Sequence, residues 1–307
     1  MIKKSIVSFF AILCLNCSNN SSIDGSEPIA LDSNTRGSGF FEYAYEFGLL
    51  SSSPMNVYYH IPPNSNSSTP ILIVFHGAGR NANEYRNSFI NKANLHSFIV
   101  LVPEFSASTF PGGDGYNLGN VYVDGDNPTL SSLNPEEEWA FSVIEPLFDF
   151  FRNSVGNLNP SYDVFGHSAG GQFAHRFVMF KPNANFDRVV ASGSGWYTMP
   201  DLAINFPYGF QNSLLTTMDF IRLYNIELTV LIGEFDDNPN ASGLRRNEFA
   251  DAQGITRYER AQSFFDKASS SAQGLDLNFN WNLEVNDDAG HDFTLAISKV
   301  SDLLFNQ

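Results

Sequence analysis

A serine lies between small residues in Gly166-His167-Ser168-Ala169-Gly170, which fits the pattern G-x-S-x-G. An apolar run, Tyr162 to Phe165, precedes it, and a segment of helical character, Ala169 to Phe180, follows it. In this context the serine occupies a strained turn, where side chains at the two glycines would clash with neighbouring backbone. Its hydroxyl then projects outward, close to the N-terminus of the helix. Ser168 is therefore a candidate nucleophile, and the alternative is a serine that caps the helix.

A serine hydroxyl needs a base to take its proton and a carboxylate to orient that base, in the chain order Ser, Asp or Glu, His. His291 lies between the last predicted strand and the C-terminal helical segment, and is the candidate base. Three carboxylates follow the predicted strand 228–232, namely Glu234, Asp236 and Asp237. The spacing from Gly233 favours Asp236 over Asp237, while Glu234 sits too early, at the strand edge.

The other five histidines are expected to have structural roles. His167 neighbours the serine, but its side chain is expected to point away from it, and His175 lies two turns further along the helix. His60 and His96 lie at the end of a strand and of a helix, outside any glycine-rich loop. His76 is expected to brace the loop in which it lies.

Backbone amides are the expected donors for an oxyanion formed during attack by Ser168. The loop His76-Gly77-Ala78-Gly79 follows the predicted strand 71–75. We expect the amide of Ala78, or alternatively that of Gly77, to act together with the amide of Ala169.

The pattern of apolar residues predicts an α/β fold. An antiparallel hairpin is expected over 40–47 and 55–61, ended by Pro62 and Pro63. Continuous apolar runs then alternate with helical segments, which is typical of buried parallel strands joined by crossover helices. The predicted strands cover 71–75, 98–102, 162–165, 188–191, 228–232 and 278–284, and the predicted helices cover 83–97, 135–153, 169–180, 257–272 and 295–305. The second predicted helix has a typical start signal. Asn134 can cap its N-terminus, Pro135 suits the first helical position, and the carboxylates of Glu136–Glu138 complement the helix dipole.

The composition limits the partners and the location of the chain. With 17 Lys and Arg against 33 Asp and Glu, the net charge is −16, which disfavours nucleic acids and anionic membranes. Residues 1–17 resemble an export signal, and Cys17 resembles the lipidation site of bacterial lipoproteins, with secretion after ordinary cleavage as the alternative. Residues 18–39 have the composition of a flexible tether, and a catalytic domain is expected over 40–307. Because both cysteines lie within residues 1–17, no internal disulfide is expected.

The Ser-Asp-His order and the His-Gly-x-Gly loop make the chain resemble the α/β-hydrolase superfamily over roughly 40–305. Within this superfamily, the chain is similar to exported esterases of the polyhydroxybutyrate depolymerase and feruloyl esterase type. The likeness rests on the motifs Gly-His-Ser-Ala-Gly-Gly and His-Gly-Ala-Gly and on the export signal. That resemblance implies a fold with a mostly parallel sheet, and Ser168, His291 and Asp236 as nucleophile, base and acid. Unlike the secreted depolymerases of this type, the chain is expected to lack disulfides and a separate polymer-binding domain.

Two long insertions, 104–134 and 195–226, leave the predicted sheet at strand ends. Aromatic residues in them, Tyr116, Trp196 and Tyr197, are candidates for substrate contact, and the alternative is a minor core beneath the loops. Asp-rich runs at 123–127 and 236–238 lack a twelve-residue calcium loop and predict turns, so no metal or cofactor is expected.

The expected function is hydrolysis of a small or polymeric carboxylic ester through an acyl-enzyme. A serine peptidase or amidase on the same fold, and a lipid-anchored binding protein without turnover, are the alternatives.

Overall fold

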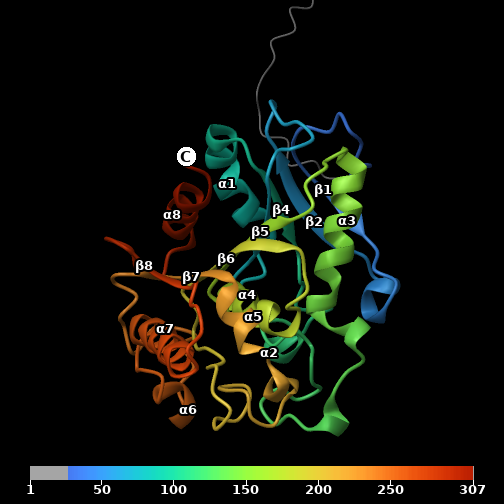
Figure 1. Ribbon diagram of the computed structural model, residues 1–307. Coiled ribbons are helices and arrows are strands. Elements are labelled where there is room, and N and C mark those ends of the chain that lie inside the picture. Colours follow the sequence, from blue (N-terminus) through green and yellow to red (C-terminus); the bar gives the residue numbers. More distant parts are fainter. Residues whose placement is uncertain (1–26, 307) are drawn as a thin grey trace, which may run out of the picture.

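The computed structural model describes residues 27–306, which form one eight-stranded sheet with helices on both faces (Figure 1). The strand order is β1-β2-β4-β3-β5-β6-β7-β8. Strands β1 and β2 pair antiparallel, β2 pairs antiparallel with β4, and every later pair is parallel. The predicted α/β fold with an N-terminal hairpin on a mostly parallel sheet is therefore confirmed.

The elements lie close to the predicted segments. The strands are β1 Gly37–Tyr43, β2 Met55–Ile61, β3 Ile71–Phe75, β4 Ile99–Pro103, β5 Tyr162–His167, β6 Phe186–Ser192, β7 Glu227–Gly233 and β8 Asn282–Asn286. The helices are α1 Ala82–His96, α2 Gly112–Gly115, α3 Ile144–Val155, α4 Ala169–Phe180, α5 Phe220–Asn225, α6 Glu248–Asp251, α7 Arg257–Gly274 and α8 Phe293–Phe305. Short 3₁₀ helices are η1 Gly48–Ser51, η2 Leu130–Ser132, η3 Glu136–Glu138, η4 Ala140–Val143 and η5 Leu214–Thr217. None of the helices within 27–306 is both long and apolar enough to cross a bilayer.

The two faces of the sheet bury different sets of apolar side chains, because successive residues of a strand point to opposite faces. Leu72 and Val74 of β3 pack in the layer under α1 and α8, which lie together on one side of the sheet in Figure 1. Ile73 and Phe75 pack in the larger cluster on the other face, which α3, α4 and α7 cover. Both faces of the central strands are thus buried, as their continuous apolar runs predict.

The sequence predicts that folded structure starts near Phe40, but the structure shows ordered contacts before this residue. Strand β1 starts at Gly37, and the N–H of Ile29 donates to the carbonyl of Phe40 at 3.0 Å. The buried guanidinium of Arg86 donates to the carbonyls of Gly39 and Tyr59, both at 3.1 Å, and so joins α1 to the hairpin. The predicted signal at 1–17, with Cys17, and the first part of the predicted tether lie outside the described residues.

The predicted start of the second helix is wrong. Glu136–Glu138 form only the 3₁₀ helix η3, and α3 begins at Ile144. Asn134 does not cap a helix: its amide donates to the carbonyl of Asn120 at 2.9 Å, while its own carbonyl accepts from Nε1 of Trp139 at 3.0 Å. Burial of Trp139 in an extended conformation interrupts the helix after one turn.

The last strand also begins later than its apolar pattern indicates, at Asn282 rather than Asn278. The N–H of Asn280 donates to the carbonyl of Tyr224 at 2.8 Å, and Nε1 of Trp281 donates to the carbonyl of Leu223 at 3.0 Å. Asn280 and Trp281, just before β8, are therefore hydrogen-bonded to α5 rather than to β7.

Phe173 on α4 lies at the centre of the larger core. Its ring centroid is 4.4 Å from that of Phe75 and 4.7 Å from that of Phe141. The rings of Phe105 and Tyr116, from the first insertion, lie 5.0 Å and 5.4 Å from it. One side chain thus joins the sheet, α4 and the first insertion.

Two buried histidines brace loops in their neutral form. Nδ1 of His76 lies 3.0 Å from the carbonyl of Gly77, to which it donates, and Nε2 accepts from the N–H of Phe105 at 3.1 Å. His175 repeats the pattern with the carbonyl of Gly171 and the N–H of Thr198. Burial lowers the pKa of His76 to about 4 and holds that of His175 well below its ordinary value. The loop-bracing role expected for His76 is confirmed.

We expect Phe173→Ala to lower the free energy of unfolding by about 3–5 kcal/mol, because it leaves a cavity where four aromatic rings meet. Urea unfolding at neutral pH measures the change. Leu158→Ala serves as the control, since that side chain is 75 % exposed, and should change the free energy by less than about 0.5 kcal/mol. A loss below about 1 kcal/mol for Phe173→Ala would contradict the central position assigned to this ring.

We expect the free energy of unfolding to fall as the pH drops from about 6.5 to about 4. In that window an unfolded histidine binds a proton, whereas folded His76 does not, so protons favour the unfolded state. From this shift, His76 alone should contribute a loss of about 3 kcal/mol across the window. Urea titrations at stepped pH should show a shallower fall in His76→Gln than in the native chain, and equal slopes would refute this assignment.

Candidate active site

Ser168 occupies the turn between β5 and α4 in a strained backbone conformation, with φ 59° and ψ −116°. The close approach of β5, α4 and β3 imposes this turn. A Cβ placed on Gly166 would lie 2.0 Å from the carbonyl oxygen of Gly170, and one placed on Gly170 would lie 1.9 Å from that of Phe75. Neither position tolerates a side chain, which confirms the steric reason for the small residues around the serine.

The structure brings Ser168, His291 and Asp236 together at the carboxyl ends of β5, β8 and β7. The hydroxyl of Ser168 lies 3.1 Å from Nε2 of His291. Nδ1 of the same imidazole lies 2.7 Å from Oδ2 of Asp236. Since the carboxylate accepts the Nδ1 proton, Nε2 of a neutral His291 is left to accept the proton of the serine hydroxyl.

The two competing carboxylates lie elsewhere. Oε2 of Glu234 accepts the backbone N–H of Asp288 at 3.0 Å, so this side chain braces the loop that precedes His291. Asp237 is exposed, whereas the Asp236 side chain is only 4 % exposed. The choice of Asp236 over its neighbours therefore agrees with the geometry.

His167 lies closer to the site than its expected orientation implies. Its Nδ1 lies 3.0 Å from Oγ of Ser192, and its ring centroid is 4.8 Å from that of His291. Burial, and then the nearby His291 and Arg257, hold its pKa well below the ordinary value. The neutral imidazole of His167 thus packs against His291 and forms a hydrogen bond with Ser192 at the end of β6.

Two of the backbone groups expected to bind an oxyanion border the serine. Ala169 is the first residue of α4, and its N–H belongs to the free N-terminal turn of that helix. A Cβ on Gly77 would lie 3.8 Å from Cβ of Ser168, so the loop after β3 passes directly beside this serine. Ala78 follows Gly77 in this loop and is exposed.

The aromatic residues expected to contact substrate, Tyr116, Trp196 and Tyr197, are buried, which favours the alternative of a minor core beneath the loops. The hydroxyl of Tyr116 donates to the carbonyl of His76 at 2.7 Å, and its ring packs in the core. The ring of Tyr197 stacks on Phe264 with centroids 4.4 Å apart. Trp196 is 4 % exposed and lies against Arg176 and Arg245.

The ring of Trp196 packs against two guanidinium groups. Cζ of Arg176 lies 4.1 Å from its centroid, and Cζ of Arg245 lies 5.0 Å from it. Arg245 also pairs with Asp126 at 2.5 Å, so this contact joins the first insertion to the loop after β7. Such cation–π stacking offsets part of the free-energy cost of burying the guanidinium groups.

Polar groups next to the serine connect both insertions, and the sequence pattern did not single them out. Nε2 of Gln172, one turn beyond Ser168, donates to the carbonyl of Trp196 at 3.2 Å. Oε1 of Gln172 accepts from the amide of Asn117 at 3.0 Å. The first turn of α4 thus holds both insertions in place beside Ser168.

Arg257 also contacts the site, and the sequence pattern did not indicate it. Its Nη1 lies 3.3 Å from Oδ1 of Asp236, and both side chains are about 95 % buried, with exposed fractions of 5 % and 4 %. The signal that could have located it is the capping box of Thr256 and Glu259, which places Arg257 at the first position of α7.

The acidic run at 123–127 folds into a bend, whereas residues 236–238 are irregular and include Asp236. Oδ1 of Asp124 accepts the backbone N–H groups of Asp126 and Asn127 at 3.0 Å and 3.1 Å. No group of three or more His, Cys, Asp and Glu side chains within residues 27–306 is arranged to hold a metal ion.

Similarity to known proteins is found among solved structures. Neither protein-family models nor curated proteins give a match. Poly(aspartic acid) hydrolase-1 from Sphingomonas sp. KT-1 is 37 % identical, with a TM-score of 0.79, over 89 % of this chain and 100 % of that one. The poly(3-hydroxybutyrate) depolymerase LpqC from Bordetella parapertussis is 28 % identical, with a TM-score of 0.79, over 89 % of this chain and 90 % of that one.

A more distant structure shares the fold. An S-formylglutathione hydrolase from Agrobacterium tumefaciens is 17 % identical, with a TM-score of 0.53, over 86 % of this chain and 91 % of that one. At this identity the likeness shows the fold alone. Together with the 37 % identical hydrolase, it shows that the chain belongs to the α/β-hydrolase superfamily and is a hydrolase of its esterase and depolymerase branch.

Proposed function

We propose that the protein is a serine hydrolase that cleaves carboxylic esters through an acyl-enzyme. The observation that carries this proposal is the hydrogen-bonded chain from Ser168 Oγ through both nitrogens of His291 to Asp236 Oδ2, with distances of 3.1 Å and 2.7 Å. These three groups can generate a nucleophile from an otherwise unreactive hydroxyl.

In the first half of the reaction, Oγ of Ser168 attacks the carbonyl carbon of the ester while Nε2 of His291 takes the hydroxyl proton. The carbonyl π electrons move to oxygen and form a tetrahedral oxyanion. When this species collapses, the bond to the alcohol oxygen breaks and the imidazolium gives its proton to that oxygen. Asp236 stabilises the imidazolium and keeps its Nδ1 proton in place throughout.

In the second half, water attacks the acyl-enzyme and His291 takes one of its protons. The tetrahedral intermediate then expels Oγ of Ser168, which recovers the proton from Nε2, and the carboxylic acid leaves. We assign stabilisation of both oxyanions to the amide of Ala169 and that of Ala78 or Gly77. The N-terminus of α4 adds favourable electrostatic potential at this point.

A polymeric substrate and an amide bond are supported by the two similar hydrolases. One of them is described as a poly(3-hydroxybutyrate) depolymerase, whose substrate is a polyester. The other is described as a poly(aspartic acid) hydrolase, whose substrate is a polyamide. Cleavage of an amide by the same three residues is therefore the second candidate function for this chain.

Export remains part of the proposal on the basis of the sequence. The two lysines and the short apolar run before Cys17 support a signal peptide with lipidation at that cysteine. The alternative is a lipid-anchored binding protein without turnover, and labelling by a fluorophosphonate distinguishes the two.

We expect Ser168→Ala and His291→Ala each to lower kcat/KM for an activated ester by at least about 1000-fold, because each removes a participant in proton transfer or bond formation. Asp236→Asn should lower it by a similar order, because the neutral amide does not stabilise the imidazolium and can hold His291 in the wrong tautomer. Intact-mass analysis after exposure to a fluorophosphonate should show one adduct on Ser168 in the native chain.

Ser154→Ala is the matched control, because Oγ of Ser154 donates to the carbonyl of Phe150 on the exposed side of α3. It should keep native activity and labelling. A folded native chain that forms no adduct would remove the hydrolase mechanism and favour the binding protein.

Matched ester and amide substrates with one acyl group distinguish the two candidate enzymes. We expect kcat/KM for the ester to exceed that for the amide by at least about 100-fold in the native chain, because the amine is the poorer leaving group and needs efficient protonation. Comparable values for both bonds, lost together in Ser168→Ala, would instead assign an amidase.

A further inference from the structure

The carboxylate of Asp236 is shared between an imidazole and a fixed cation. Its Oδ2 lies 2.7 Å from Nδ1 of His291, and its Oδ1 lies 3.3 Å from Nη1 of Arg257. Both partners of the ion pair are almost fully buried. The acid of the site therefore carries a compensating charge on the side opposite His291.

The first turn of α7 places this cation. Thr256 caps the helix in a capping box with Glu259, so that Arg257 follows at the first helical position. The N–H of Tyr258 donates to the carbonyl of Asp236 at 3.1 Å, and Nη2 of Arg257 donates to the carbonyl of Ser242 at 3.3 Å. One helical turn thus holds both the backbone and the side chain of the acid.

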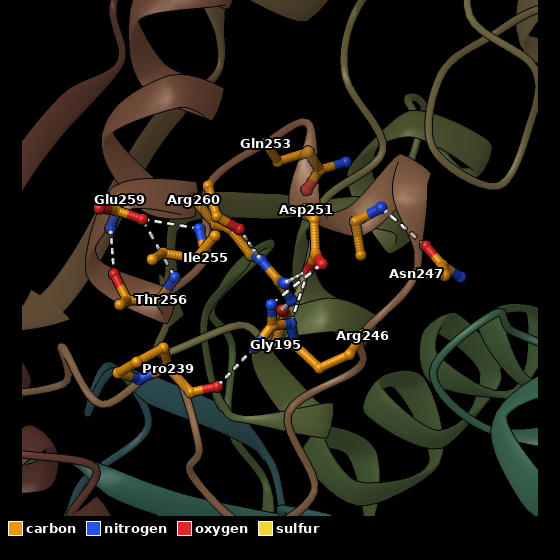
Figure 2. Close-up of polar contacts among 12 residues, drawn as sticks. Gly195, Pro239, Arg246, Asn247, Asp251, Gln253, Ile255, Thr256, Glu259 and Arg260 are labelled. Atoms are coloured by element: carbon orange, nitrogen blue, oxygen red, sulfur yellow. Dashed lines mark hydrogen bonds and ion pairs between the residues drawn. The ribbon is translucent and has the colours of Figure 1, made fainter.

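An arginine network fixes this turn against the neighbouring loops, as Figure 2 shows. Arg260 donates to the carbonyls of Gly195 and Gly254 and to Oδ1 of Asp251, at 2.6 Å, 2.7 Å and 3.0 Å. Arg246 donates to the same carboxylate at 2.8 Å and 3.1 Å and to the carbonyl of Pro239 at 2.8 Å. The network joins the loop after β6, the loop that carries the acid and the start of α7.

We propose that Arg257 is a positioning residue for the Asp236–His291 pair, whose fixed charge keeps the carboxylate ionised and limits how strongly the imidazole retains a proton. This inference rests on the proposed function. A cation beside the carboxylate offsets part of the field that favours an imidazolium. His291 is then available as a neutral base at lower pH than beside a bare buried carboxylate, while Oδ2 stays aimed at Nδ1.

The other ionisable groups around the pair do not supply this charge. His167 packs on His291 but is buried with a strongly lowered pKa, and burial raises the pKa of Tyr197, whose ionisation the Asp236 charge further disfavours. Asp292 caps α8 with its carboxylate, and Glu234 binds the N–H of Asp288. Asp237 is exposed on the loop. Arg257 is therefore the cation in direct contact with the pair.

The test is the pH dependence of labelling by a fluorophosphonate, followed by intact mass on the full chain. The rate should fall on the acid side as His291 takes up a proton. We expect the acid limb to move to higher pH by about half a unit or more in Arg257→Gln and Arg257→Met, which remove the charge. The plateau rate should fall as well, because Asp236 loses a partner. Arg257→Lys, which keeps the charge, should retain the native position of the limb.

Arg152→Gln is the matched control, since Arg152 pairs with Asp149 on the exposed side of α3 and should give the native profile. Two neutral variants are used so that the comparison does not depend on one of them folding, and near-UV circular dichroism checks both. An unchanged acid limb in a folded neutral variant, or an equal shift in Arg257→Lys, would overturn the inference. Absence of labelling in the native chain would instead reject the proposed function itself, which keeps the two failures distinct.

Discussion

The close contact of β5 and α4 with the backbone of β3 is the constraint on which the site depends. At Gly166 and Gly170 these segments approach until no Cβ fits between them, and Ser168 adopts a positive φ in the turn that joins β5 to α4. Such strain persists when the surrounding structure over-determines it. Here the aromatic core around Phe173 holds α4 against the sheet and so maintains the turn.

Buried cations are concentrated around the site, in a chain whose net charge is −16. Arg176 stacks on Trp196, Arg260 binds two carbonyls and Asp251, and Arg257 contacts Asp236. A buried guanidinium is tolerated where carbonyls, carboxylates or aromatic faces replace its water. The same contacts tie the loops after β6 and β7 to α6 and α7, so the arginines act as structural links between segments that have little regular pairing.

Much of the fold and the central residues of the site could be predicted from local sequence. Continuous apolar runs such as Ile71–Phe75 indicate strands buried on both faces, and observed α4 matches the predicted helix from Ala169 to Phe180. Parallel strands bring their carboxyl ends to one edge of the sheet, so residues just after them become neighbours without further information. Ser168, Asp236 and His291 follow β5, β7 and β8, and this rule is enough to place them together.

The surroundings of the site could not be predicted in this way, because they depend on contacts between distant segments. Asn134 carries a good capping signal, but burial of Trp139 redirects the chain into a 3₁₀ turn. Tyr116 and Tyr197 lie in the two long insertions, and both are buried once these fold over α4 and α7. The capping box at Thr256 fixes where α7 starts, whereas the contact of Arg257 with Asp236 depends on how that start packs against the loop after β7. Local sequence patterns therefore indicate which side chains meet at the site. Packing between distant segments determines which charged and apolar side chains surround them.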